Sequence, residues 1–204
     1  MNAYQKEQLE ALQIVRGQTL NLSSDVKKEL GRYMAFREQT AAFHRMHFEK
    51  ICTEQCFLDN LSACCSKDGI IVFFADVVIN AVYSSEKELD LLEHAIENPA
   101  MPGKCIFLSP EGCLWRIKPI VCEMFVCNTA KEAAFKDHSE NAAQWEEFEK
   151  QRKTFTWPDR PVLFEHLERI FLDKGLDSSL MHIHTSPGLM RIRKNRNKNP
   201  LGNH

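Results

Sequence analysis

The stretch KCIFLSPEGCLWRIKPIVCEMFVC, from Lys104 to Cys127, organises the chain because it holds four of the eight cysteines. The other four lie in ICTEQCFLDNLSACC, at residues 51–65, and no cysteine falls outside these two clusters. The 39 residues between the clusters contain none. Cysteines that merely fill a core would be scattered as small apolar residues, so the clustering indicates a shared role for the thiols.

A tight turn is predicted in the middle of this stretch. The residues Ser109-Pro110-Glu111-Gly112 place Pro at the second and Gly at the fourth position, as a type I turn prefers. Short segments rich in β-forming residues flank the turn on both sides. The predicted hairpin brings Cys105 and Cys113 close to each other.

The chain after the hairpin is predicted to add two more thiols to the same place. Pro119 ends the second strand, because proline cannot donate to a strand ladder. Cys122 and Cys127 are five residues apart and are expected near one face of a short helical turn.

The N-terminal residues MNAYQKEQLEALQ contain no apolar core of a signal peptide, and the longest apolar run, Ile70–Ala75, is too short to cross a bilayer. We therefore expect a cytoplasmic protein without a membrane segment. In a reducing compartment, clustered cysteines more often bind metal or exchange electrons than form disulfides. Disulfides and simply buried thiols remain the alternatives.

The cysteine pattern resembles a known family. The second cluster reads Cys-x-Phe-Leu, then Gly-Cys with an aromatic residue two positions on, then Pro-x-x-Cys-x-x-Phe-x-Cys. This pattern is similar to that of the YkgJ-type cysteine-cluster family, also described as a CxxCxxCC or zinc- or iron-chelating domain. The resemblance covers residues 52–127. The adjacent Cys64-Cys65, followed by a β-prone run and Asp76-Val77, fits the first half of the pattern, which is stretched here. Lys118 and Glu123 stand where the family often has arginine. The resemblance implies a metal or iron-sulfur site and specifies no reaction.

The candidate ligands are all eight thiols. They are Cys52, Cys56, Cys64, Cys65, Cys105, Cys113, Cys122 and Cys127. Thiolates suit zinc and iron-sulfur clusters rather than calcium or magnesium, and eight of them exceed what one zinc ion needs. We therefore prefer an iron-sulfur cluster to zinc, with one site or two left open. The spacing matches neither a zinc ribbon nor the bacterial ferredoxin pattern.

Function and partners follow from this metal hypothesis. We expect a structural, redox or sensory metal-binding protein, with a protein redox partner possible. The alternative is a cluster-dependent enzyme, since some relatives with this cysteine pattern are lysine N-methylases that use S-adenosylmethionine. The chain has no glycine-rich strand-to-helix turn of the kind that nucleotide cofactors usually need. A net charge of -2 does not favour nucleic-acid binding. The only sequence feature that favours it is the group of basic residues within 191–198.

The predicted fold class is α+β and predominantly helical, with a small cysteine-rich metal-binding core that contains a short hairpin. N-terminal helices are expected in residues 1–50, the cysteine-cluster domain in 51–128, helices packed on it in 129–176 and a basic, flexible tail in 177–204. His44 and His47 lie on the helix that leads to the first cysteines and could add nitrogen ligands, but positions on an ordinary helix surface or at the edge of the core fit them better.

Local signals place the remaining elements. A first helix is predicted over residues 4–15, and a second begins at a cap among Ser23, Ser24 and Asp25. A third begins at the capping box at 85–88, and a fourth runs from a second capping box at 129–132 to about Lys153. A fifth runs from Pro161 to Gly175. A buried strand is predicted over Ile70–Phe74, followed by a helix to Tyr83.

Overall fold

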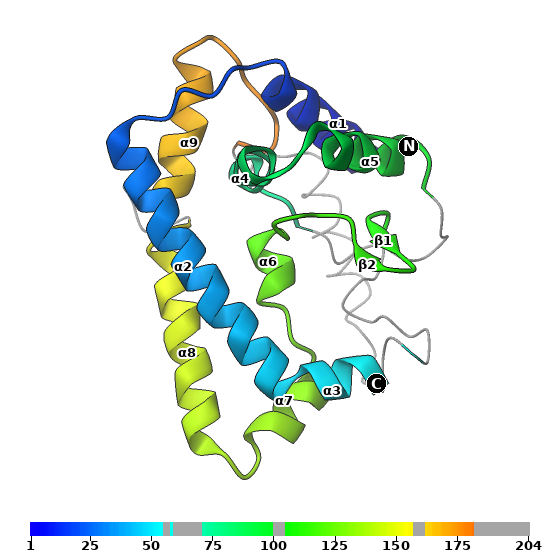
Figure 1. Ribbon diagram of the computed structural model, residues 1–204, viewed down its shortest axis with the longest axis vertical. Coiled ribbons are helices and arrows are strands. Elements are labelled where there is room, and N and C mark those ends of the chain that lie inside the picture. The colour runs from blue at the N-terminus through cyan, green and yellow to red at the C-terminus, as the bar shows by residue number, and fades with distance from the viewer. Residues whose placement is uncertain (55–57, 59–70, 100–104, 157–161, 182–204) are drawn as a thin grey trace.

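The protein is described by a computed structural model over residues 1–54, 58, 71–99, 105–156 and 162–181 (Figure 1). Within these residues it is mostly helical with one short antiparallel hairpin, which confirms that part of the predicted class. The elements, in chain order, are α1 (Ala3–Arg16), α2 (Ser24–His47), α3 (Glu49–Cys52), α4 (Phe74–Tyr83), α5 (Glu86–Glu97), β1 (Leu108–Ser109), β2 (Gly112–Cys113), α6 (Ile120–Glu123), α7 (Asn128–Phe135), α8 (Ser139–Lys153) and α9 (Leu163–Leu172).

The longest described helix, α2, begins where its cap was predicted. The Ser23 hydroxyl accepts a hydrogen bond from the Val26 N–H at 3.3 Å, which satisfies one of the donors left open at the helix start. The helix ends at Phe48, and α3 continues the chain in a new direction. The predicted capping box at the start of α5 is also present, with Ser85 and Glu88 bonding each other's backbone N–H.

Aromatic side chains join α2 to α8 and to the chain before α9. The Phe43 and Phe148 rings meet edge to face with centroids 5.6 Å apart, and Phe36 stacks on Phe155 at 5.5 Å. Tyr33 meets the same Phe155 edge-on at 5.4 Å. Figure 1 shows α8 and α9 lying along the length of α2. Such ring pairs add to the apolar burial that holds these helices together.

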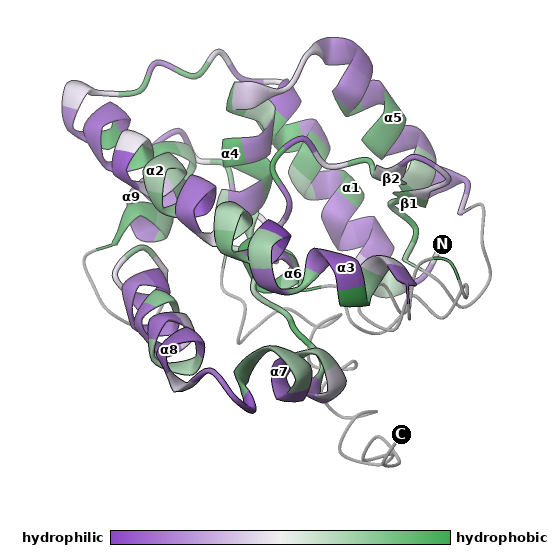
Figure 2. Cartoon of the chain, turned by 60° about the horizontal axis from the view of Figure 1, so that its bottom comes forward, coloured by the Kyte–Doolittle hydropathy of each residue, from purple (hydrophilic) through white to green (hydrophobic). Residues whose placement is uncertain are grey.

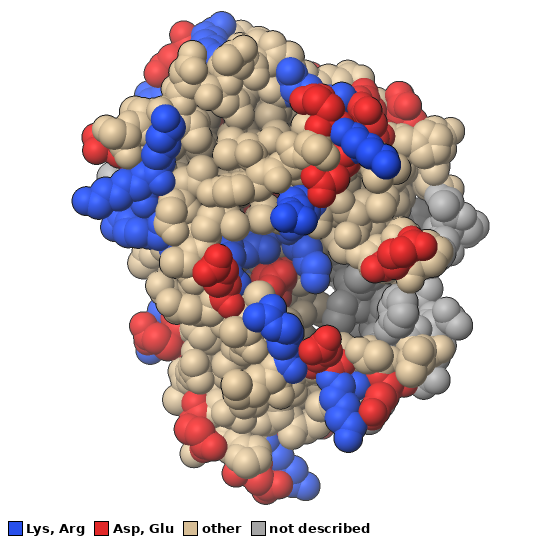
Figure 3. Space-filling view, in the orientation of Figure 1, with Lys and Arg blue, Asp and Glu red and all other residues tan. Residues whose placement is uncertain are grey.

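A second group of helices packs around α4. The helix contacts α1 on one side and α9 on the other, and α1 also contacts α5. Every residue from Phe74 to Asn80 is buried, and Figure 2 shows the hydrophobic residues of α4 between these neighbours. On the outer surface, the guanidinium of Arg16 joins α1 to α5 through Glu86, Asp90 and Glu93, at 3.0, 2.6 and 2.5 Å. These charges form part of the mixed acidic and basic patch over α1 and α5 in Figure 3.

The predicted strand before α4 is wrong over its described part. Residues 71–73 form no strand, and Phe74 already begins the helix. The N–H of Val72 donates to the Tyr4 hydroxyl at 2.7 Å, that of Phe73 to Asp76 at 3.1 Å, and that of Phe74 to the Leu180 carbonyl at 3.4 Å. These partners take the place of a neighbouring strand, so the segment is buried and extended without a sheet.

The predicted helix over residues 129–153 is divided. The helix α7 begins at Asn128, one residue before the predicted capping box, and a turn at residues 136–138 separates it from α8. The Phe135 ring of α7 contacts Phe48 at the start of α3, whereas Phe148 of α8 contacts α2. The chain must turn between these two packing directions.

The described chain stays packed on the core as far as Met181, with Leu180 fully buried. Most of the predicted basic tail, residues 182–204, lies outside the described residues, and the predicted domain boundaries remain predictions. No helix in the described ranges is both long and apolar enough to cross a membrane.

Candidate metal centre

The hairpin predicted within the second cysteine cluster is confirmed, but each strand has only two residues, and the second ends at Cys113 rather than at Pro119. Leu108 pairs with Cys113 and Ser109 with Gly112 in antiparallel register. Gly112 has a φ of 119°, a backbone conformation that side chains other than glycine rarely adopt. The Ser109 hydroxyl accepts from the Glu111 N–H at 3.2 Å and donates to the Gly112 carbonyl at 3.0 Å. Turn geometry and side-chain bonding therefore fix the loop together.

Cys105, three residues before β1, and Cys113, on β2, differ in exposure. Cys105 is buried in the core, and its carbonyl accepts from the Leu108 N–H at 3.0 Å. Cys113 is exposed. The hairpin is anchored behind them by the buried rings of Phe107 and Trp115, which meet edge to face with centroids 5.3 Å apart.

Two polar side chains of α4 hold the segment that leads to Cys122. The Asn80 side-chain oxygen accepts from the Ile117 N–H at 2.8 Å, and the Asp76 carboxylate accepts from the Ile120 N–H at 3.0 Å. Asn80 and Asp76 are 1% and 3% exposed. The carboxylate also lies at the N-terminus of the short helix α6, where backbone N–H groups lack helical partners.

A buried arginine of α2 holds the same segment from the other side. The guanidinium of Arg37, only 7% exposed, donates to the Tyr33 hydroxyl at 3.0 Å and to the Lys118 carbonyl at 2.7 Å. It also pairs with the Glu123 carboxylate at 3.5 Å. A buried cation is costly unless it is paired and hydrogen-bonded, and Arg37 meets both conditions.

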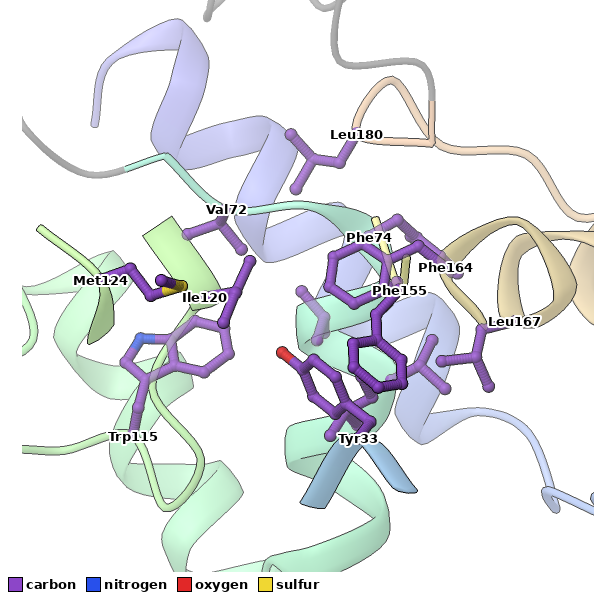
Figure 4. Close-up of a cluster of buried hydrophobic side chains, with 14 of the residues drawn as sticks. Tyr33, Val72, Phe74, Trp115, Ile120, Met124, Phe155, Phe164, Leu167 and Leu180 are labelled. Atoms are coloured by element: carbon purple, nitrogen blue, oxygen red, sulfur yellow. The ribbon is translucent and has the colours of Figure 1, made fainter. Parts of the chain in front are cut away.

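Tyr4, in the first turn of α1, joins the chain before α4 to the surroundings of Cys122. Its hydroxyl bonds both backbone groups of Val72, which follows Cys65 by seven residues. Burial raises the pKa of this hydroxyl, and the nearby Cys122 side chain adds to that rise. Figure 4 shows Val72 beside Ile120, the first residue of the helix that carries Cys122. The described chain just before α4 is thus fixed next to the start of α6.

Burial also sets the protonation of two groups near α6. Burial raises the pKa of the Asp76 carboxyl to about 6, against the opposing effects of its two backbone hydrogen bonds and of Arg37. Burial lowers the pKa of His44, against the effects of the nearby Glu123. Near neutral pH, Asp76 is therefore largely ionised while His44 is neutral.

The predicted ligands fall into two sets. The described ones are Cys52 on α3, Cys105 before the hairpin, Cys113 on β2, Cys122 on α6 and Cys127 just before α7. The others, Cys56, Cys64 and Cys65, lie outside the described residues. In the described part of the chain, no three Cys, His, Asp or Glu side chains converge to hold a metal. The eight-thiol ligand set therefore stays a prediction.

The two histidines before the first cluster lie in the aromatic core edge between α2 and α8. His44 packs edge-on against Trp145 with ring centroids 5.3 Å apart. His47 lies against the Phe43 ring at 4.3 Å, and its Nδ1 is 3.3 Å from the Asn141 side-chain nitrogen. These contacts fit the interpretation of both side chains as core-edge residues.

Sequence reasoning missed the polar residues that hold the cysteine segment. Tyr4, Arg37 and Asn80 all make long-range contacts that no local spacing predicts. One signal was available: Asp76 and Asn80 are the only polar residues of an otherwise apolar helix and are four positions apart, on one face.

Comparison of the chain with protein-family models, with curated proteins and with solved structures gives no match. The resemblance to the cysteine-cluster family therefore depends on the residues quoted for it, and the function is argued from the geometry.

Proposed function

We propose that the protein binds an iron-sulfur cluster, or alternatively zinc, through its clustered cysteine thiolates, with a structural, redox or sensory role. The observation that carries the proposal is the polar framework around residues 117–123, which fixes the segment bearing Cys122. Three buried side chains, Arg37, Asp76 and Asn80, bond its backbone. Functional residues are commonly carried on segments that a rigid scaffold holds in this way.

The free-energy cost of burying these polar side chains supports this interpretation. An apolar helix that only fills a core needs neither Asp76 nor Asn80, and burying a carboxylate and a guanidinium in a small core is unfavourable. These hydrogen bonds hold only the seven residues 117–123, which contain Pro119 and α6. We infer that the position of Cys122 is what the framework preserves.

The second support is the position of the described chain before α4. Metal ligands that lie far apart in sequence must be brought together by the fold, and Tyr4 holds Val72 by hydrogen bonds while its hydroxyl lies near enough to Cys122 for that side chain to raise its pKa. A bound iron-sulfur cluster would supply electron transfer, and a closed zinc site would stabilise the fold.

The decisive experiment is anaerobic purification with iron, sulfide and zinc counted per chain and an absorption spectrum recorded. Replacing Cys105, Cys113, Cys122 or Cys127 by Ser is expected to lower the metal content and the melting temperature. The matched control is His47→Gln, which changes a potential ligand outside the clusters and should keep the metal content. Full metal content in all four serine variants would exclude the second cluster as the ligand set.

The enzyme alternative has its own measurement. Calorimetric titration of the metal-loaded protein with S-adenosylmethionine should give no binding heat if the chain is a metal-binding module alone. Saturable binding would favour the methylase-like alternative.

A further inference from the structure

A hollow lies where four helices meet. It has a volume of about 520 Å³ and is bordered by the end of α1, the loop after it, the start of α2, the end of α4 and the start of α5. Figure 1 shows this loop, in blue, above α4. Small-molecule sites in proteins usually measure about 300–1,000 Å³. None of the described cysteines lines the hollow, so a ligand here is separate from the proposed metal centre.

Most of the wall of the hollow is aliphatic. Its apolar side chains include Val15, Leu20, Leu22, Leu30, Val82 and Leu89. The helix α4 changes character at this wall, because Phe74–Asn80 is buried throughout whereas Val82 and Tyr83 are 38% and 42% exposed. Large apolar side chains left uncovered at a concave surface are typical of a site that takes an apolar ligand.

A glycine of α2 leaves space for such a ligand. Gly31 lies in the interior of the helix and lines the hollow, and a Cβ added there would meet no atom within 4 Å. A glycine inside a helix costs about 1 kcal/mol relative to alanine. Neither a positive φ nor a close neighbour requires glycine at this position. The space that its missing side chain leaves belongs to the hollow.

The charged residues that line the hollow leave one cation without a partner. Arg16 and Glu86 pair with each other at 3.0 Å, and the same guanidinium also pairs with two further carboxylates of α5. The third charged residue of the lining, Lys27, makes no ion pair with any described residue. The Tyr83 hydroxyl lines the same hollow and can donate a hydrogen bond. The hollow thus offers a cation and a donor to a negatively charged group.

We propose that this hollow binds a small amphipathic carboxylate of the fatty-acid class. The acyl chain lies against the aliphatic wall beside Gly31, and the carboxylate pairs with the Lys27 ammonium at the rim. An aliphatic wall suits a flexible hydrocarbon chain, and the unbalanced positive charge of the lining selects an anionic head group over a neutral or cationic one. The site goes beyond the proposed metal binding and uses none of the cysteines.

The test titrates decanoate, decanol and decylamine separately into the purified full chain near neutral pH. The three probes share one apolar chain and differ in the charge of the head group. Isothermal titration calorimetry measures each affinity, and amide chemical shifts in the decanoate complex locate the site. The variants are Lys27→Gln and Gly31→Leu. Their matched controls, Lys28→Gln and Arg32→Leu, make similar changes at the next exposed positions of α2, which do not line the hollow.

The proposal expects decanoate to bind more tightly than decanol and decylamine, with amide shifts centred on Gly31 and Tyr83. Lys27→Gln should lower the decanoate affinity by about fivefold, as the loss of an exposed ion pair does, and leave the decanol affinity unchanged. Gly31→Leu should weaken binding of decanoate and decanol by more than about tenfold without lowering the melting temperature, because leucine favours the helix and fills the hollow. Both controls should bind like the unsubstituted chain.

Three results would overturn the proposal. They are no saturable binding of decanoate, equal or tighter binding of decylamine or decanol, and a decanoate affinity that Gly31→Leu leaves unchanged. None of these results depends on the metal content of the chain, so failure of the carboxylate site is distinguishable from failure of the proposed function.

Discussion

Asp76 carries two tasks with one carboxylate. One of its oxygens accepts from the Phe73 N–H at the start of α4, and the other accepts from the Ile120 N–H at the start of α6. Both bonds favour the ionised form, yet burial prevails and raises the pKa to about 6. The charge is therefore retained at neutral pH at a cost in folding free energy.

The stability contributed by Asp76 should depend on pH in a defined direction. Its pKa is about 6 in the fold against 3.8 as the reference value, so the folded state binds the proton more tightly. The free energy of unfolding should then rise as the pH falls from 7 to 4, by roughly 2 kcal/mol for this group alone. Urea unfolding of the protein and of Asp76→Asn across this range measures the difference. A difference that is constant with pH would show that Asp76 has an ordinary pKa.

Replacing two of the glycines by alanine should change the free energy of unfolding in opposite directions. Gly31 lies inside α2, and a Cβ added there would meet no atom within 4 Å, so Gly31→Ala should raise the free energy of unfolding by about 1 kcal/mol. Gly175 has a φ of 73° after α9, so Gly175→Ala should lower it by about 1 kcal/mol through backbone strain. Thermal unfolding of both variants checks the pair. A lower free energy of unfolding in Gly31→Ala would contradict the open space found around the Gly31 position.

At the scale of elements, α6 depends on other helices more than on itself. It has four residues and no side-chain cap of its own, and a helix of that length is not stable in isolation. Its N-terminus is capped by Asp76 of α4, and its last residue, Glu123, pairs with Arg37 of α2. The short helix is thus formed by tertiary contacts.

Removing Arg37 should therefore weaken the whole fold. Arg37→Leu would leave the Glu123 carboxylate, 11% exposed, and the Lys118 carbonyl without their partner, so we expect a loss of about 3 kcal/mol in urea unfolding. The matched control on the same helix is Arg32→Leu. Its pairing with Glu29 is exposed and 3.8 Å long, so the change should stay within about 0.5 kcal/mol. Similar losses in both variants would refute the special role of Arg37.

How far the sequence predicts these elements depends on the range of the deciding contacts. Local rules correctly predicted the caps at Ser23 and Ser85 and the turn ending at Gly112, because each depends on neighbouring residues. Local rules failed at residues 71–73, whose N–H groups bond Tyr4 and other distant partners. They also failed at the turn between α7 and α8, which is set by two separate packing surfaces.

The same limit applies to the candidate site. Cysteine clustering identified the segments of interest, and the hairpin could be predicted from its turn. The polar contacts of Arg37 and Asn80 with those segments join residues 81 and 37 positions apart in the sequence. Periodic patterns in the sequence do not predict contacts between residues so far apart.

At the scale of the whole molecule, Tyr4 couples α1 to the part of the chain that carries the cysteines. Its hydroxyl contacts Val72 across 68 residues, and its side chain is buried beside Cys122. The first turn of the first helix thereby becomes part of the surroundings of the proposed metal centre.

Deleting this hydroxyl should uncouple α1 from the cysteine segments. Tyr4→Phe leaves the Val72 N–H without its acceptor in a buried position, so the free energy of unfolding should fall by about 1–3 kcal/mol. Amide hydrogen exchange at Val72 should also become faster. The control is Tyr83→Phe, whose side chain is 42% exposed, and which should change neither quantity. Unchanged exchange at Val72 in Tyr4→Phe would contradict the coupling.

The 68-residue span of the Tyr4 contact also has a consequence for protein synthesis. The helix α1 leaves the ribosome before α4 and α5, against which it packs and which follow about seventy residues later. At ribosomal rates of roughly 5–20 residues per second, its apolar face waits on the order of several seconds for a partner. During that interval the nascent chain presents a natural target for chaperones, and slow codons before the α4 coding region would prolong it.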